Sequence, residues 1–278
     1  MIGVIDVGGG LRDIYGAGVF DTCLENNINF DCCIGVSAGA ANVASFVAKQ
    51  PGRNYRFYNE YAFRKEYMSV NNLLEGKKFL DLDYVYGVLS NTGGEDPVNF
   101  ENIKNFNGII NIVATDIETG RAKYFDNGDI QLDNLEILKA SSSIPVVCGK
   151  TEINGKLYYD GGIADPVPLK RAIELGCDKI VLILTRPIGY DISSKSDFIM
   201  SDVLSEKYPK CANALRVRAV RYKRTVDYAE KLQNEGKCLI IAPDDCCGVE
   251  TLTKDKSKLD SLYRKGITDG KKILDFVK

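Results

Sequence analysis

Ser37 has the strongest sequence signs of a reactive side chain. It stands in Gly35-Val36-Ser37-Ala38-Gly39, which matches the Gly-x-Ser-x-Gly pattern of a nucleophile elbow. An apolar stretch precedes this string and an alanine-rich stretch follows it, as a sharp strand-to-helix turn requires. Such a turn exposes the hydroxyl beside the first N–H groups of a helix. The alternative interpretation is a tight turn with a small polar residue and no chemistry.

A nucleophilic serine needs a base, and the composition narrows the choice. The 278 residues include no histidine, which excludes Ser-His-Asp and Cys-His systems and histidine metal sites within this chain. A carboxylate is therefore the candidate base, and burial or concerted transfer must compensate for a free aspartate pKa of about 3.9. Asp160 ends a predicted strand and precedes Gly161 and Gly162. An Asp-Gly turn without function is the alternative.

Gly8, Gly9 and Gly10 form a loop between the first predicted strand and the first predicted helix. Consecutive glycines let backbone N–H groups converge on one negative oxygen, either an oxyanion or a phosphate. A dinucleotide loop would need glycine at position 13, where Asp13 stands and would repel a pyrophosphate. Arg12 is expected to steady the loop or attract an anionic head group. A turn without a ligand, or a phosphate- or nucleotide-binding module without catalysis, remains open.

The elements that must position these groups follow an α/β rhythm. Strands are predicted over 2–7, 30–35, 108–116, 179–185 and 237–242, a pairing segment over 121–125, and a hairpin over 152–159 around Asn154-Gly155. Helices are predicted over 13–25, 38–49, 53–90, 134–140, 167–175, 199–234 and 257–276. The pattern predicts a mainly parallel sheet with helices on both faces. Parallel strand ends then bring the serine, the aspartate and the glycine loop to one edge.

The three strings and their order resemble the patatin-like phospholipases, which are lipid acyl hydrolases, and a bacterial subgroup in particular. That family carries Gly-Gly-Gly-x-Arg, then Gly-x-Ser-x-Gly, then Asp-Gly-Gly or Asp-Gly-Ala. Gly8–Arg12, Gly35–Gly39 and Asp160–Gly162 match these strings. The run Ala140–Pro145 also resembles the segment that precedes the aspartate motif in the family. The match covers about residues 3–168.

The resemblance implies a three-layer sandwich in one compact domain over 1–278. The catalytic region would span about 3–168, and a C-terminal extension over about 169–278 would pack on it. The implied activity is hydrolysis of carboxylic esters of lipids or phospholipids, without a metal or organic cofactor. Asp13 departs from the family pattern, because many members have glycine there.

The resemblance also implies a role for each site residue. Ser37 would attack the ester carbonyl, and Asp160 would accept its proton and later activate water. The N–H groups of Gly9 and Gly10 would bind the oxyanion, in a loop shaped by Gly8 and Arg12, and an acyl-enzyme would form on the serine. A family member that binds lipid without catalysis is a further alternative.

Charge and cysteine usage bear on partners and location. The net charge is −2, which gives no global attraction to nucleic acid. Nine cysteines without a disulfide framework, no signal peptide pattern and an apolar run of only 34–48 favour a cytoplasmic protein. The aromatic and cationic residues of 53–67 could cap an acyl pocket or touch a lipid interface, and the alternative is packing on the core. The cations of 207–224 could dock on anionic phospholipid or bind phosphate, and the alternative is a solvated helix face. No feature indicates an oligomeric state.

Overall fold

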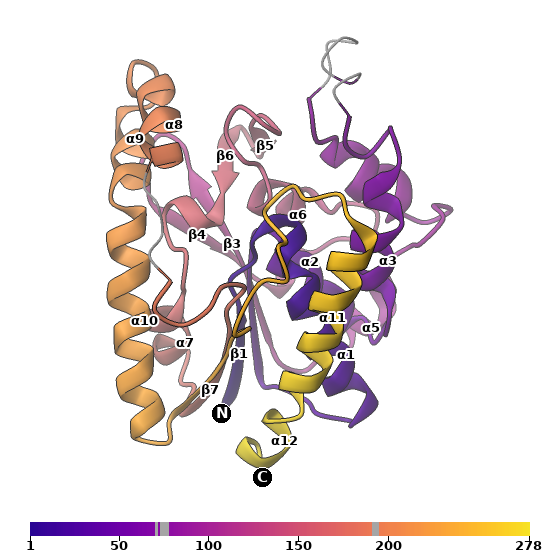
Figure 1. Ribbon diagram of the computed structural model, residues 1–278. Coiled ribbons are helices and arrows are strands. Elements are labelled where there is room, and N and C mark those ends of the chain that lie inside the picture. The colour runs from indigo at the N-terminus through magenta and orange to yellow at the C-terminus, as the bar shows by residue number, and fades with distance from the viewer. Residues whose placement is uncertain (70–71, 73–77, 191–194) are drawn as a thin grey trace.

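The computed structural model describes residues 1–69, 72, 78–190 and 195–278. The described residues form a mixed eight-stranded sheet between two sets of helices (Figure 1). Its strand order is β5-β6-β3-β2-β1-β7-β8, and β4 pairs with β3 outside this path. The strands are β1 (Ile2–Asp6), β2 (Cys32–Val36), β3 (Ile109–Asp116), β4 (Ala122–Phe125), β5 (Thr151–Ile153), β6 (Lys156–Asp160), β7 (Lys179–Ile183) and β8 (Cys238–Ile241).

Strands β3, β2, β1, β7 and β8 run parallel to one another. Strands β4 and β6 run antiparallel to β3, and β5 and β6 form the predicted hairpin, with positive φ at Asn154 and Gly155. The predicted α/β fold with a mainly parallel sheet and helices on both faces is confirmed. Because the chain begins at the lower edge in Figure 1, the carboxyl ends of the parallel strands point upward.

Successive residues of the central strand enter opposite cores. Val4 packs in the core beneath α1 (Ile14–Glu25) and α2 (Ala38–Val47), whereas Ile5 packs in the core on the other face. This alternation follows from the two-residue period of a strand. Helices cover both faces of β1, so its residues are buried on both sides, and Ile2, Val4 and Ile5 supply apolar side chains while Asp6 at its end is a buried carboxyl.

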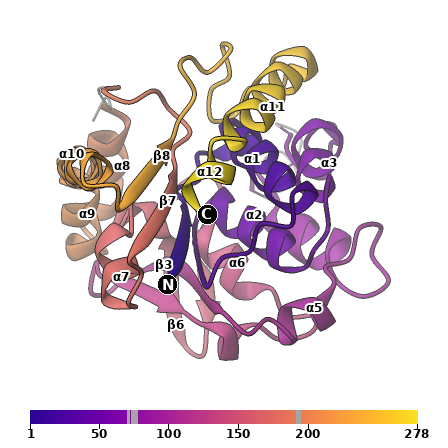
Figure 2. The same cartoon turned by 90° about the horizontal axis from the view of Figure 1, so that it is seen from below.

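Figure 2 shows the two helical layers along the strands. With α1 and α2 lie α3 (Arg53–Asn59), α5 (Phe100–Lys104), α6 (Glu136–Ser141), α11 (Lys256–Gly270) and α12 (Ile273–Phe276). The other face carries α7 (Leu169–Glu174), α8 (Lys195–Ser205), α9 (Pro209–Arg216) and α10 (Arg218–Asn234). Helix α11 packs on α1, where a Cβ on Gly266 would lie 2.1 Å from the Tyr15 carbonyl oxygen.

Two predicted helical stretches differ in the structure. In 53–90, the described residues form α3, a 3₁₀ turn η2 (Tyr61–Phe63) and a π-helical turn η3 (Tyr84–Leu89), while 70–71 and 73–77 lie outside the described residues. The aromatic residues of this stretch are spaced according to their packing in the core, so their spacing does not follow the period of one continuous helix. In 199–234 the chain forms α8, α9 and α10. Pro209 separates the first two, because it is favoured at the first position of a helix and starts α9, and α9 and α10 are separated at Val217.

The C-terminal part of the chain continues the same sheet, since β7 pairs with β1 and β8 with β7. The extent of the domain over 1–278 stays a prediction. All nine cysteines are free, and Cys32 and Cys33 are buried in β2. None of the helices in the described ranges is long and apolar enough to cross a bilayer.

Candidate active site

Ser37 occupies the turn between β2 and α2. Its φ is 57° and its ψ is −129°, a strained backbone conformation for a residue with a side chain. The glycines on either side leave room for this turn. A Cβ on Gly35 would lie 2.5 Å from the Ala40 Cα, and one on Gly39 would lie 2.5 Å from the Asp6 carbonyl oxygen. The predicted strand–turn–helix setting of the serine is therefore present.

Asp160 lies at the end of β6 and reaches the serine directly. The Ser37 Oγ donates to its Oδ2 at 2.5 Å, and the Gly162 N–H donates to its Oδ1 at 2.8 Å. Gly161 allows the chain to turn here, because its Cβ would lie 2.1 Å from the Val113 carbonyl oxygen of β3. The structure thus brings together two side chains that lie 123 positions apart in the sequence.

The environment of Asp160 favours its action as a base. The residue is buried, and this desolvation raises the pKa of its carboxyl above the ordinary value of 3.8. Hydrogen bonds from Ser37 and Gly162 and the cationic charge of Arg218 offset part of this rise in pKa. A carboxylate with a raised pKa binds a proton more readily than a solvated aspartate does, as proton transfer from a hydroxyl requires.

The glycine loop packs against the elbow. A Cβ on Gly8 would lie 2.2 Å from the Val36 carbonyl oxygen and 3.0 Å from the Ser37 Cβ, so only glycine allows this approach. Its φ of +71° adds a second reason for glycine. The Gly8 N–H donates to Asp6 Oδ1 at 3.1 Å, and its carbonyl accepts from Thr185 Oγ1 at 2.6 Å. Gly9 and Gly10 continue the loop and also have positive φ, at 148° and 60°.

Ser141 is a site residue to which the sequence assigned no role of its own. Its Oγ accepts the Ser37 N–H at 2.9 Å and donates to the Val113 carbonyl oxygen at 2.6 Å. It therefore fixes the backbone of the strained turn to strand β3. The signal was present in the run Ala140–Pro145, but nothing in that run says which serine turns toward the elbow.

Two buried carboxyls lie behind the glycine loop. The Asp6 carboxylate accepts from Gly8 N–H and Asn42 Nδ2, and the carboxyl of Asp13 lies next to it. Among the described residues, no donor reaches either oxygen of Asp13. Burial raises the pKa of Asp6 to about 6, and burial together with the Asp6 charge raises the pKa of Asp13 well above 3.8. A hydrogen bond between the two carboxyls requires a proton on one of them.

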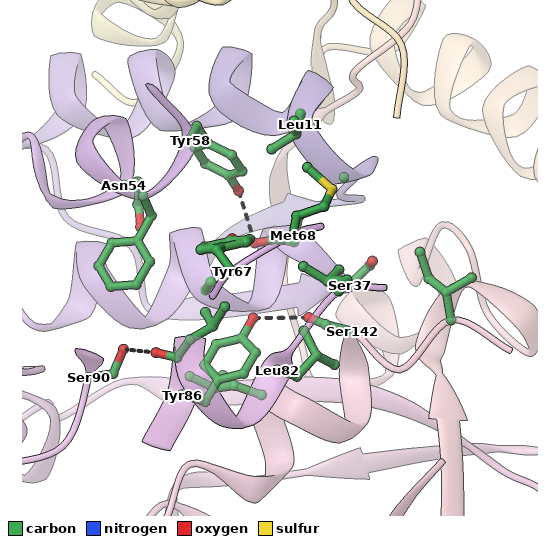
Figure 3. Close-up of a pocket in the computed structure, with 18 of the residues that line it drawn as sticks. Leu11, Ser37, Asn54, Tyr58, Tyr67, Met68, Leu82, Tyr86, Ser90 and Ser142 are labelled. Atoms are coloured by element: carbon green, nitrogen blue, oxygen red, sulfur yellow. Dashed lines mark hydrogen bonds between the residues drawn. The ribbon is translucent and has the colours of Figure 1, made fainter. Parts of the chain in front are cut away.

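An apolar cavity of about 70 Å³ opens on one side of Ser37 (Figure 3). Tyr58, Met68, Leu82 and Tyr86 are among its walls in that view. Further apolar lining comes from Leu11, Ala38, Ala41, Phe57, Tyr67, Leu80, Val85, Val98, Leu135, Leu138, Ile144 and Leu252. Several aromatic residues of 53–67 thus line a cavity beside the serine as well as packing in the core.

A second, more polar cavity of about 340 Å³ lies on the other side of the serine. Ser37 and Asp160 both line it, together with Arg12, Arg186 and Arg218. Arg218 belongs to the basic run 207–224, most of whose cations are exposed. The serine therefore stands between an apolar space and a cationic one, which suits a substrate with an acyl chain and a polar leaving group.

The chain segment between β8 and α11 closes over this edge of the sheet, as Figure 1 shows. Thr251 lines both cavities. Its carbonyl oxygen accepts the Leu11 N–H at 2.9 Å, and its Oγ1 accepts from Arg12 Nη1 at 2.7 Å. Thr251 thereby holds the end of the glycine loop from outside, and no motif in the sequence marks it.

Within the described ranges, no group of three or more metal-ligating side chains gathers in one place. The carboxyls of the site are used otherwise, since Asp160 accepts from the serine and Asp6 from the glycine loop. The arrangement is that of a hydroxyl, a carboxyl that accepts from it, and a glycine loop packed against the same turn.

Two family models match two separate parts of the chain. The family model described as patatin-like phospholipase matches residues 7–173, and a model described as a domain of unknown function (DUF6363) matches residues 208–278. The uncharacterized protein YjjU of Escherichia coli K12 is 30% identical over 67% of this chain and 52% of its own length. Lysophospholipase nte1 of Aspergillus niger is 23% identical over 100% of this chain and 18% of its own length.

Among solved structures, VipD from Legionella pneumophila aligns with a TM-score of 0.49 and 12% identity, over 99% of this chain and 66% of that chain. The chain spans about half the length of the bacterial relative and a smaller part of the fungal one.

Proposed function

The chain belongs to the patatin-like phospholipase family, and on that premise we propose that it hydrolyses carboxylic esters of lipids or phospholipids through a Ser37–Asp160 dyad. The observation that carries the proposal is the 2.5 Å hydrogen bond from the Ser37 Oγ to the Asp160 Oδ2 at a strained elbow. With no histidine in the chain, this carboxyl is the base in contact with the nucleophile. The lysophospholipase named among the relatives supports an ester-hydrolysing role.

The mechanism follows from this contact. As the Ser37 Oγ bonds to the substrate's carbonyl carbon, its proton passes to Asp160 Oδ2, and the carbonyl electron pair moves onto oxygen. The Gly8 N–H is bound to Asp6, so the N–H groups of Gly9 and Gly10 serve as the oxyanion donors. Collapse of this intermediate expels the alcohol, which takes the proton from the aspartic acid.

The second half-reaction repeats these transfers with water. Asp160, now a carboxylate again, accepts a proton from a water molecule that attacks the acyl-enzyme carbonyl. When the new intermediate collapses, the proton returns to Ser37 Oγ and the fatty acid leaves. The apolar cavity would hold the acyl chain in both halves, and the cationic cavity would hold the leaving group.

A covalent probe tests this proposal directly. We expect a fluorophosphonate to label wild-type protein at Ser37, located by mass spectrometry, and Ser37→Ala to lose both labelling and hydrolysis of a short-chain aryl ester. Loss of the nucleophile in a serine hydrolase costs on the order of 10⁶-fold in kcat. Binding of a nucleotide without labelling would favour the phosphate-binding alternative, and lipid binding without labelling would favour a silent family member.

We also propose peripheral contact with an anionic membrane. Helix α8 exposes Phe198, Ile199 and Val203, and the cations of 207–224 follow it. Apolar side chains next to cations suit the boundary between lipid head groups and acyl chains. Sedimentation with phosphatidylserine vesicles tests this, with Ile199→Glu expected to weaken binding and neutral vesicles as the control. Equal binding of the wild-type protein and Ile199→Glu to both kinds of vesicle would contradict it.

A further inference from the structure

We infer that Arg186 and Arg12 together form a binding site for a phosphate group on the leaving group of the substrate, with Glu250 as the competing anion. The inference rests on the proposed function, because it assigns a substrate class to the same site. It adds two residues, Arg186 and Glu250, that lie outside the sequence motifs and outside the matched region 7–173.

Arg12 is built into the wall of the cationic cavity. Its side chain is only 8% exposed, and Nη1 is held by Thr251 Oγ1 at 2.7 Å. Among the described residues, no partner reaches its buried Nε. A Cβ placed on Gly9 would lie 3.1 Å from the Arg12 Nη2, so the guanidinium lies against the loop that we assign to the oxyanion. An anion bound by Arg12 would therefore sit next to the reacting ester.

Arg186 approaches the same space from the end of β7. It follows Thr185, whose Oγ1 donates to the Gly8 carbonyl oxygen at 2.6 Å, so the backbone before it is fixed to the glycine loop. Its guanidinium stacks 4.1 Å from the centre of the Tyr190 ring, and 19% of the side chain is exposed. Arg186 is thus held in one orientation while one side of it remains open to the cavity.

Among the described residues, Arg12 and Arg186 have one ion-pair partner between them, and the Asp160 carboxyl also lines the cavity. Arg12 and Arg186 share one carboxylate, Glu250, at 3.6 Å and 3.4 Å, and 72% of that side chain is exposed. Arg218 also lines the cavity, but its charge is matched by two hydrogen bonds to Asp197, which is buried. Burial and the charge of Arg186 both lower the pKa of Arg12, as expected for two neighbouring cations.

A phosphate suits this arrangement better than a neutral polar group does. Guanidinium groups bind phosphate oxygens through paired, charge-assisted hydrogen bonds, and two of them from different directions suit a group with several negative oxygens. Glu250 reaches both arginines from a solvent-exposed position, so a buried phosphate can displace it at little cost. We therefore expect the phosphate ester of a lipid to be preferred over the same lipid without phosphate.

The test compares two substrates that differ only in the phosphate. Wild-type protein should hydrolyse octanoyl lysophosphatidate with a higher kcat/KM than monooctanoylglycerol. The ratio of the two values should fall roughly ten- to hundredfold in Arg186→Gln, the range for a lost hydrogen bond to a charged group. It should rise in Glu250→Gln, because the competing carboxylate is gone, and Arg186→Lys should fall between wild type and Arg186→Gln.

Lys237 and Glu235 offer a matched control pair. They form an exposed ion pair at 2.8 Å, and neither lines the cationic cavity. Lys237→Gln and Glu235→Gln change the net charge as the two test variants do, so a mere long-range effect of charge would move the ratio in both pairs. Thermal unfolding checks that each variant is folded. If Arg186→Gln does not fold, the ratio measured for Glu250→Gln decides the test.

Each outcome decides the question. A ratio in Arg186→Gln and Glu250→Gln equal to that of the control pair overturns the inference and leaves the proposed function standing, provided Ser37 is labelled. If neither ester is hydrolysed and Ser37 is not labelled, the proposed function fails, and calorimetric binding of glycerol phosphate then judges the site. Equal binding of glycerol phosphate by wild type and Arg186→Gln overturns the inference. Inorganic phosphate binding as tightly, without a preference for the phosphate ester, overturns the assignment to the leaving group.

Discussion

The region over 7–173 and the region over 208–278 contribute to the same site in different ways. The first supplies the hydroxyl, the carboxyl and the glycine loop, each within a recognisable string. The second supplies Arg218, Thr251 and Leu252, which lie in the walls of the cavities and belong to no known motif. The difference teaches that each group proposed to react stands in a short recognisable string, whereas the groups of the second region that surround them do not.

Helix α11 explains how the second region reaches the first. Gly18 and Gly266 let α1 and α11 approach closely, since a Cβ on either would meet the backbone of the other helix at 2.3 or 2.1 Å. Tyr15 and Tyr263 add hydrogen bonds between these helices, to Asp269 and Asp21. The docked helix thereby fixes the preceding segment, which carries Thr251, over the glycine loop.

The largest effect should come from the first region. Asp160→Asn keeps the size of the side chain but removes its ability to accept the serine proton. We expect kcat on an aryl ester to fall on the order of 10⁴- to 10⁶-fold, with the rate of fluorophosphonate labelling falling in parallel. Steady-state kinetics and labelling time courses measure both.

Asp165→Asn is the matched control for this change. Asp165 lies in the same loop and is buried enough for its pKa to be raised, but its carboxylate accepts from Tyr124 at 2.6 Å instead of the serine. It should keep most of the activity. Equal losses in the two variants would mean that the loop, and not the carboxyl beside Ser37, carries the effect.

The second effect tests whether the C-terminal region positions the glycine loop. Thr251→Val keeps the shape and removes the oxygen that accepts from Arg12 Nη1. We expect kcat to fall about tenfold with little change in KM, in line with the loss of one hydrogen bond to a charged group. Thr251→Ser should restore kcat, and kcat and KM measured for all three proteins decide it. If valine and serine behave alike, Thr251 acts by packing alone.

The fold was predictable where turn-forming residues clearly separate the apolar runs. Apolar runs bounded by glycine, asparagine or proline gave the parallel strands and the hairpin at Asn154-Gly155, because backbone preferences there agree with the global fold. The stretch 53–90 was not predictable in the same way. Buried Arg53 lies there because it bonds to Ser90 and to the Asp96 carbonyl, and such contacts leave no periodic trace in the sequence.

The residues of the candidate site likewise differ in whether the sequence alone could identify them. Ser37 and Asp160 could be paired in advance because their strings and the ends of their strands were visible. Thr251 could not, because its contact with Arg12 joins positions 239 apart and requires no special residue type. Arg186 is likewise one of 36 cations, and only the fold shows which of them faces the serine.

The third effect concerns stability and the departure from the family pattern at Asp13. The unfolded chain loses the carboxyl protons of Asp6 and Asp13 near pH 3.8, whereas in the folded protein the pKa of Asp6 is raised to about 6 and that of Asp13 is also raised well above 3.8. The stability of the fold should therefore decline as pH rises through this window. Asp13→Asn removes one charge and adds a donor toward Asp6, which should stabilise the protein by about 1–3 kcal/mol at pH 8.

Urea unfolding at pH 5 and pH 8 measures this prediction. Asp6→Asn is not an equivalent change, since the Asp6 carboxylate also accepts from Gly8 and Asn42. Asp275→Asn, at an exposed ion pair with Lys278, is the control that should leave the pH dependence intact. An unchanged pH dependence in Asp13→Asn would mean that the two carboxyls do not share a proton.

The smallest effect asks whether the C-terminal region tunes the base of the first region. The positive charge of Arg218 stabilises the Asp160 carboxylate and lowers its pKa, against the larger effect of burial. Because the carboxylate is the active form, kcat/KM should fall as pH drops through this pKa. Arg218→Gln removes the charge and leaves Asp197 unpaired, and both changes move the pKa and the acidic limb of the pH profile upward. Profiles of wild type, Arg218→Gln and the exposed control Arg216→Gln measure the shift. A limb that moves equally in both variants, or not at all, would mean that the charge of Arg218 does not tune the pKa of Asp160.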